Sequence, residues 1–197
     1  MSAAAQPVVS PEVAALLKLE ADPARGKELF SGCADCHRKD ASGRANGIFP
    51  RLAGQHATVL IKQLSDIRDG RRSNPSMLPL AAELSSKEVV DIAAFLQSLP
   101  VGERNGKGPG AATARGRQLY ERDCADCHGA AGEGDPAAFR PMVAAQHYRY
   151  LLREVSTIRD GQRGNSDPEM VRLIKDYSAT DIEAVADYMS HLPPPRR

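Results

Sequence analysis

The sequence contains no tryptophan, and aromatic residues make up only 5% of its 197 residues. An interior filled mainly by aromatic side chains is therefore excluded. Neither positive nor negative charge predominates, because 26 basic and 25 acidic side chains leave a formal net charge of +1. This balance argues against a nucleic-acid-binding protein. With 42% hydrophobic residues, the chain still has enough apolar material to fold.

Long hydrophobic runs are absent as well. The longest apolar stretches, such as residues 89–96, are short and interrupted by charge, so no transmembrane segment is expected. A peripheral association with a membrane stays open. The first nine residues, MSAAAQPVV, lack the basic start and the length of a secretory signal. Taken alone, this N-terminus indicates a cytosolic protein.

The second half of the chain repeats the first. Its cysteine pair follows the earlier one at an offset of 91 residues (124 minus 33). The matched positions include Pro50 with Pro141, Gln55-His56 with Gln146-His147, residues 67–74 with 158–165 and, after two inserted residues, Met77 with Met170. A glycine-rich linker separates the two copies. We therefore predict an N-terminal extension at 1–21, a first domain at 22–100, a linker at 101–112 and a second domain at 113–197.

Each copy indicates an all-α domain, because apolar residues recur at helical spacing and no strand pattern appears. Helices are predicted at residues 23–32, 55–68 and 85–96, with counterparts at 114–123, 146–159 and 178–189. A short amphipathic helix is also predicted from Ser10 to about Glu20, either packing on the first domain or offering a partner surface. The long loops between these helices are expected to wrap around a bound group.

Four cysteines occur, and each pair is followed at once by a histidine. The two motifs are Cys33-Ala34-Asp35-Cys36-His37 and Cys124-Ala125-Asp126-Cys127-His128. Cys-x-x-Cys-His is the attachment signal for c-type haem: two thiols in one helical turn reach the two vinyl groups, and the imidazole meets the iron. A structural zinc site would need more closely spaced pairs, and a thioredoxin-like redox pair would need alternating strands and helices. The sequence therefore predicts two covalently bound haem c groups, with iron ligands His37 and His128.

The second axial ligand decides the potential and the function of such an iron. Met77 and Met170 occupy matching places before the last helix of each copy, and we expect them to be these ligands. Their competitors in the sequence are Met142 and Met189, which are interpreted as core residues. His56 and His147 leave a bis-histidine alternative open, although polar residues at helix starts are usually solvated or capping. Four arginines of the repeated IRDG segment either bind haem propionates or cover a solvated helix end: Arg68, Arg72, Arg159 and Arg163.

These motifs together resemble the dihaem cytochrome c4 family over about residues 22–193, most clearly in GKELF-x-x-CADCH (26–37) and PRLAGQH (50–56). The resemblance implies two tandem class I cytochrome c domains related by pseudo-twofold symmetry, with His/Met iron in both. It implies that each ligating histidine donates to a proline carbonyl, which here falls on Pro50 and Pro141. It also implies a close crossing of the first and last helices at Gly26 and Gly116. MVAAQH in the second copy departs from this pattern.

With six-coordinate iron in both domains, no site is left for a substrate. We therefore expect a non-enzymatic carrier of single electrons in a bacterial periplasmic respiratory chain, passing them toward a terminal oxidase. The partners would be redox proteins, namely an oxidase, an upstream cytochrome complex or a dehydrogenase. An electron-accepting subunit of a dehydrogenase is the main alternative, and a dihaem peroxidase or sulfur-compound dehydrogenase is a further one. Haem attachment outside the cytoplasm also reverses the N-terminal indication and implies a removed signal.

Overall fold

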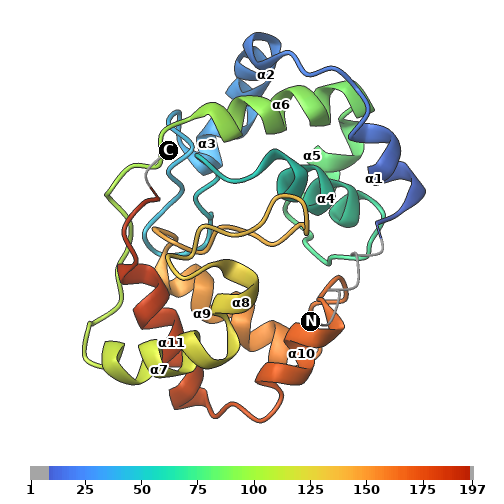
Figure 1. The fold of residues 1–197 in the computed structure, drawn as a ribbon. Coiled ribbons are helices and arrows are strands. Elements are labelled where there is room, and N and C mark those ends of the chain that lie inside the picture. The colour runs from blue at the N-terminus through green and yellow to red at the C-terminus, as the bar shows by residue number, and fades with distance from the viewer. Residues whose placement is uncertain (1–8, 196–197) are drawn as a thin grey trace.

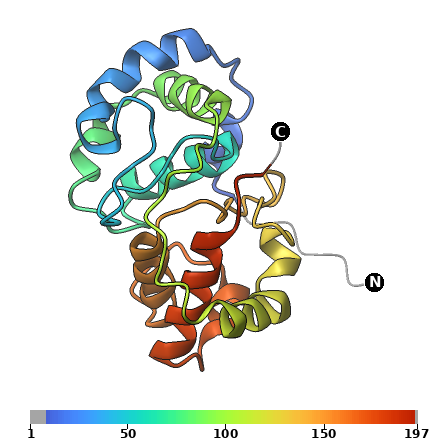
Figure 2. The same ribbon diagram turned by 90° about the vertical axis from the view of Figure 1, so that its left-hand side faces the viewer.

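The computed structural model describes residues 9–195, and these form two helical domains, one above the other in Figures 1 and 2. The beginning of the predicted extension (residues 1–8) and residues 196–197 lie outside the described part. Within that part, the only β pairing is an isolated bridge between Asp135 and Arg140. The prediction of an all-α fold is confirmed.

The elements of the first domain are α1 (Pro11–Leu16), α2 (Pro23–Leu29), the 3-10 turn η1 (Phe30–Cys33), α3 (Ala34–His37), α4 (Ala57–Arg68), α5 (Leu78–Glu83) and α6 (Ser86–Ser98). Three of these helices begin at a capping side chain: α1 at Ser10, α2 at Asp22 and α6 at Ser85. The Asp22 side chain accepts the N–H groups of residues 24 and 25 at the start of α2. Ser85 and Glu88 form the predicted capping box of α6. These local bonds fix where α2 and α6 start.

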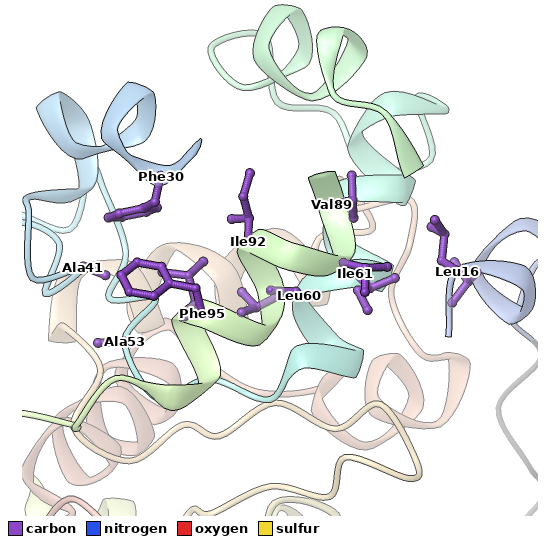
Figure 3. Close-up of a cluster of buried hydrophobic side chains, with 13 residues drawn as sticks. Leu16, Phe30, Ala41, Ala53, Leu60, Ile61, Val89, Ile92 and Phe95 are labelled. Atoms are coloured by element: carbon purple, nitrogen blue, oxygen red, sulfur yellow. The ribbon is translucent and has the colours of Figure 1, made fainter. Parts of the chain in front are cut away.

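Helices α2 and α6 cross so closely that only glycine fits at the contact. A Cβ added at Gly26 would lie 2.0 Å from the carbonyl oxygen of Asp91. Beside this crossing the rings of Phe30 and Phe95 pack with centroids 5.7 Å apart. Figure 3 shows these rings within the apolar cluster that also receives Leu16 from α1. The crossing holds the start of the first cysteine motif against this core.

The second domain repeats this arrangement. It consists of α7 (Thr113–Asp123), α8 (Ala125–His128), α9 (Tyr148–Arg159), α10 (Pro168–Ile174) and α11 (Ala179–His191). At the crossing of α7 and α11, a Cβ on Gly116 would lie 2.0 Å from the carbonyl oxygen of Ala184. Tyr120 and Tyr188 pack there with ring centroids 5.4 Å apart. The duplication seen in the sequence is therefore a duplication of the fold.

Some predicted helix limits differ from the structure. Helices α4 and α9 begin two residues later than predicted, because His56 and His147 have ψ angles of 131° and remain outside the helix. The long loops before α6 and α11, for which no helix is predicted, contain the short helices α5 and α10. Helix α1 ends at Leu16 and packs on the first domain, with Leu16 itself 2% exposed. Of the two interpretations of this helix, packing on the first domain is the one the structure supports.

Candidate haem-binding sites

The first cysteine motif lies where η1 passes into α3. Phe30, at the start of η1, is buried in the core, and Cys33 packs against the same cluster. His37 ends α3 and is 5% exposed. The next residue, Arg38, has a φ of 66°, so the chain turns away directly after the histidine. One short turn thus presents two thiols and an imidazole.

The second motif has the same local form. Helix α7 ends at Asp123, Cys124 caps it, and α8 carries the chain to His128. Gly129, which matches Arg38 in the repeat, has a φ of 79°. Glycine adopts a positive φ without the steric strain that arginine has in the first copy. Both motifs therefore end in the same sharp turn.

Each histidine ring is oriented by the backbone of a proline. His37 Nδ1 lies 3.2 Å from the carbonyl oxygen of Pro50, and His128 Nδ1 lies 2.9 Å from that of Pro141. Because a carbonyl only accepts, Nδ1 is the protonated nitrogen and Nε2 keeps the lone pair. Burial lowers the pKa of both histidines, although the proline carbonyls act in the opposite direction. A neutral imidazole of fixed tautomer is the form that binds a metal.

All four cysteines are half-buried, and no disulfide joins them. Cys33 packs on the first core and Cys124 on the second. Burial is the main cause that raises the pKa of Cys33, and it raises the pKa of Cys124 to about 12. Among the described residues, no three histidine, cysteine or acidic side chains gather as a metal cluster. This donor set fits a largely apolar group held by thiols and one imidazole better than a zinc ion.

The two methionines precede the last helix of their domains, as the repeat predicts. Met77 is the half-buried residue before α5, and its N–H donates to Asn74 Oδ1 at 3.2 Å. Met170 is the third residue of α10 and packs partly on the second core. The two-residue insertion in the second copy thus changes the local position of the methionine relative to its helix.

The competing residues have other partners. Met142 and Met189 are buried, 5% and 4% exposed. His56 Nε2 donates to the carbonyl oxygen of Glu133 at 2.7 Å, in the other domain. His147 Nε2 donates to that of Ser42 at 2.8 Å, and its Nδ1 accepts the N–H of residue 106. Both histidines therefore bridge the domains, which removes the support for the bis-histidine alternative.

The comparison with known proteins agrees with this geometry. The family model described as Cytochrome c matches residues 23–100 and again residues 113–193. The chain belongs to the cytochrome c family. A thiosulfate dehydrogenase electron acceptor of Stutzerimonas stutzeri (strain A1501) is 36% identical, with 91% of each chain covered. Cytochrome c4 of Pseudomonas aeruginosa is 34% identical, covering 87% of this chain and 89% of that protein.

Solved structures of other proteins also resemble this chain. Reduced recombinant cytochrome c4 from Pseudomonas stutzeri superposes with a TM-score of 0.78 at 28% identity, covering 88% of this chain and all (100%) of that one. Thiosulfate dehydrogenase TsdBA from Marichromatium purpuratum gives a TM-score of 0.76 at 29% identity, covering 87% of this chain but only 40% of that one. This cytochrome therefore has the two-domain fold of cytochrome c4 and, with its two attachment motifs, carries two covalently bound haem c groups. No helix in the described part is both long and apolar enough to cross a membrane.

Two glutamines hold the domains of this cytochrome together, a role that the sequence does not predict. Gln55 Nε2 donates to the carbonyl oxygen of Met142 at 3.0 Å, and Gln55 Oε1 accepts the Met142 N–H at 3.0 Å. Gln146 makes the same pair of bonds with Arg51, at 3.0 and 2.9 Å. The positions in these two pairs are related by the repeat offset, as pseudo-twofold symmetry requires. The matched Gln-His pairs were the signal in the sequence.

The repeated arginines bind protein groups. Arg68 pairs with Glu12 of α1, and Arg159 donates to the carbonyl oxygen of Tyr177 at 3.1 Å. Arg72 and Arg163 both reach Glu154. With side chains 12% and 17% exposed, neither belongs to a solvated helix end, so that interpretation is wrong for these two. Their contacts also leave the propionate role without structural support.

Proposed function

We propose that this dihaem c-type cytochrome carries single electrons through two haems, each ligated by a histidine and a methionine. We propose that Cys33 and Cys36 anchor the first haem and Cys124 and Cys127 the second. His37 with Met77 and His128 with Met170 would be the axial ligands, and Pro50 and Pro141 would hold the histidines. The observation that carries this proposal is the pair of matched histidine–proline hydrogen bonds, at 3.2 and 2.9 Å. When bound, each haem iron gains or loses one electron.

The residues of the chain then set how readily this happens. A histidine that donates through Nδ1 is fixed in orientation and becomes a more basic ligand. Methionine as the second ligand would raise the potential of the iron. We propose domain limits of 22–100 and 113–197, with an extension at 1–21 and a linker at 101–112. Each domain would then provide one complete His/Met site, with no open position for a substrate and no enzymatic role.

The proposed setting is the bacterial periplasm, because haem attachment to this motif takes place outside the cytoplasm. There the protein would receive electrons from an upstream cytochrome complex or a dehydrogenase and pass them toward a terminal oxidase. The partners are thus redox proteins, and no nucleic acid is involved.

A second candidate function is that of electron acceptor bound to a dehydrogenase. Its support is the 36% identity to a thiosulfate dehydrogenase electron acceptor and the likeness to part of TsdBA. Co-purification of a catalytic chain from the source periplasm would favour this candidate, and recovery of the cytochrome alone would favour the free carrier.

Absorption spectra of the full-length protein test the ligation. The oxidised protein should have the near-infrared methionine–iron band at an intensity that corresponds to two haems, and the reduced protein should not bind carbon monoxide. Binding of carbon monoxide by one haem, or a band of half the intensity, would contradict the simple carrier.

A further inference from the structure

The peptide group between Pro50 and Arg51 is held from both ends by side chains of different domains. Its carbonyl oxygen lies 3.2 Å from His37 Nδ1 in the first domain. Its N–H donates to Gln146 Oε1 in the second domain at 2.9 Å. A second bond runs from Gln146 Nε2 to the carbonyl oxygen of Arg51 at 3.0 Å. One amide thus connects a glutamine of one domain with the histidine of the other.

The reverse connection is also present. The peptide group between Pro141 and Met142 accepts from His128 Nδ1 through its carbonyl, at 2.9 Å. Its N–H donates to Gln55 Oε1 in the first domain at 3.0 Å. Gln55 Nε2 donates to the carbonyl oxygen of Met142, also at 3.0 Å. Each histidine is therefore linked, through one peptide group, to a glutamine of the opposite domain.

Water has little access to these connections. Gln55 and Gln146 are 8% and 7% exposed, and Arg51 and Met142 are 3% and 5% exposed. In such surroundings hydrogen bonds in a chain polarise one another, by about 10–30% per bond. An amide that donates through its N–H carries more negative charge on its oxygen, because the two atoms share one π system. The proline carbonyl then becomes a stronger acceptor for the histidine Nδ1–H.

We propose that Gln146 and Gln55 are positioning residues that tune the axial histidine of the opposite domain. This inference rests on the proposed ligation by His37 and His128. A stronger carbonyl acceptor makes the imidazole more basic, which stabilises the ferric state and lowers the potential. Through these bonds, the contact between the domains would affect the histidine ligands and thereby the reduction potentials of both haems.

Gln146→Met and Gln55→Met in the full-length holoprotein test whether each glutamine affects the haem of the opposite domain. Methionine keeps the length of the side chain but removes its hydrogen bonds to the backbone. In a redox titration followed by NMR, the two haems are distinguished by the resonances of Met77 and Met170. Gln146→Met should lower the ferric-to-ferrous ratio of the first haem about two- to tenfold at a fixed potential. Gln55→Met should do the same to the second haem.

Thr58→Val is the matched control. Thr58 Oγ1 donates across the same interface to the carbonyl oxygen of Pro136 at 2.8 Å but touches neither glutamine-linked peptide. It should leave both potentials unchanged. Gln146→Asn keeps the polar amide but shortens the side chain, and serves if methionine disturbs the interface. As an independent readout, the His37 Nδ1 proton should exchange with solvent faster in both Gln146 variants than in Thr58→Val.

Three results would contradict this role of Gln146. Gln146→Met could shift the potential of the second haem more than that of the first, shift both potentials equally, or shift neither more than Thr58→Val does. Those results leave the proposed function intact, provided the wild-type spectra have two His/Met signatures. A wild-type spectrum without them overturns the ligation and this inference together.

Discussion

Arg72 of the first domain and Glu154 of the second form an ion pair across the domain interface, with Arg72 Nη2 2.9 Å from Glu154 Oε2. Glu154 Oε2 also lies 3.1 Å from Arg163 Nη1, so this one oxygen contacts two guanidinium groups. The side chains of Arg72, Glu154 and Arg163 are 12%, 15% and 17% exposed. Both arginines come from the repeated IRDG segment, which therefore meets at the interface from both domains.

Glu154→Gln should destabilise the holoprotein, because it removes the ion-pair partner of two largely buried guanidinium groups. Breaking a buried pair costs about 3–5 kcal/mol, and the partial exposure here reduces the expected loss to about 2–3 kcal/mol. Urea unfolding measures it. Glu121→Gln is the control, since Glu121 and its partner Arg117 are 56% and 66% exposed. That change should cost little, because an exposed ion pair contributes weakly to stability. Equal losses in the two variants would contradict the assignment.

The sequence predicted those parts of the fold that depend on neighbouring residues. Helix starts at Asp22 and Ser85 follow from their caps, and the cysteine motifs follow from the chemistry of attachment. The repeat predicted the second domain from the first. All of these depend on spacing within a few residues or on matched positions, and both can be read from the chain.

The contacts between the domains could not be read in this way. His56 and His147 stand at helix starts, where polar residues usually meet solvent, and were interpreted accordingly. Their acceptors in the structure are carbonyl groups 77 and 105 residues away. Every residue has a backbone carbonyl. The sequence therefore contains no signal that shows which carbonyl a side chain binds. The same reason hid the role of Gln55 and Gln146.

Met77→Ala and Met170→Ala should each remove one axial ligand. Each variant should lose about half of the near-infrared band and bind carbon monoxide at one haem upon reduction, since an open position admits the gas. Absorption spectroscopy measures both effects. Met189→Leu is the control, because Met189 is 4% exposed in the second core and leucine has a similar volume. Loss of the band in Met189→Leu, or its retention in Met170→Ala, would contradict the ligand assignment.

Gly26→Ala should strongly destabilise the first domain. The new Cβ would lie 2.0 Å from the carbonyl oxygen of Asp91, and backbone on both sides must move to admit it. Overpacking of this kind costs about 1–3 kcal/mol, and rigid backbone places this case at the upper end. Gly32→Ala is the control, since nothing lies within 4 Å of its added Cβ. Thermal unfolding should leave that variant unchanged or slightly stabilised. A similar loss in both would mean that the crossing of α2 and α6 tolerates a side chain.

Asp91 makes part of the stability depend on pH. Its carboxylate is fully buried and accepts hydrogen bonds from the Asp22 N–H at 2.7 Å, from Arg25 at 3.2 Å and from Lys87. Burial favours the protonated acid, but these bonds and charges outweigh it and lower the pKa of Asp91. Since the folded pKa is below the unfolded one, the stabilisation is present above the ordinary pKa near 4 and is lost as the pH falls further.

Asp91→Asn should therefore be less stable than the wild type at pH 7, and the difference should shrink as the pH falls below about 4. Urea unfolding at a series of pH values measures the difference in free energy of unfolding directly. Asp176→Asn, at an exposed position after α10, should differ little from the wild type at any pH. A difference between Asp91→Asn and the wild type that stays constant down to pH 3 would mean that Asp91 contributes by its shape and hydrogen bonds rather than by its charge. The Lys87 and Arg25 contacts would then be incidental to the stability of the helix crossing.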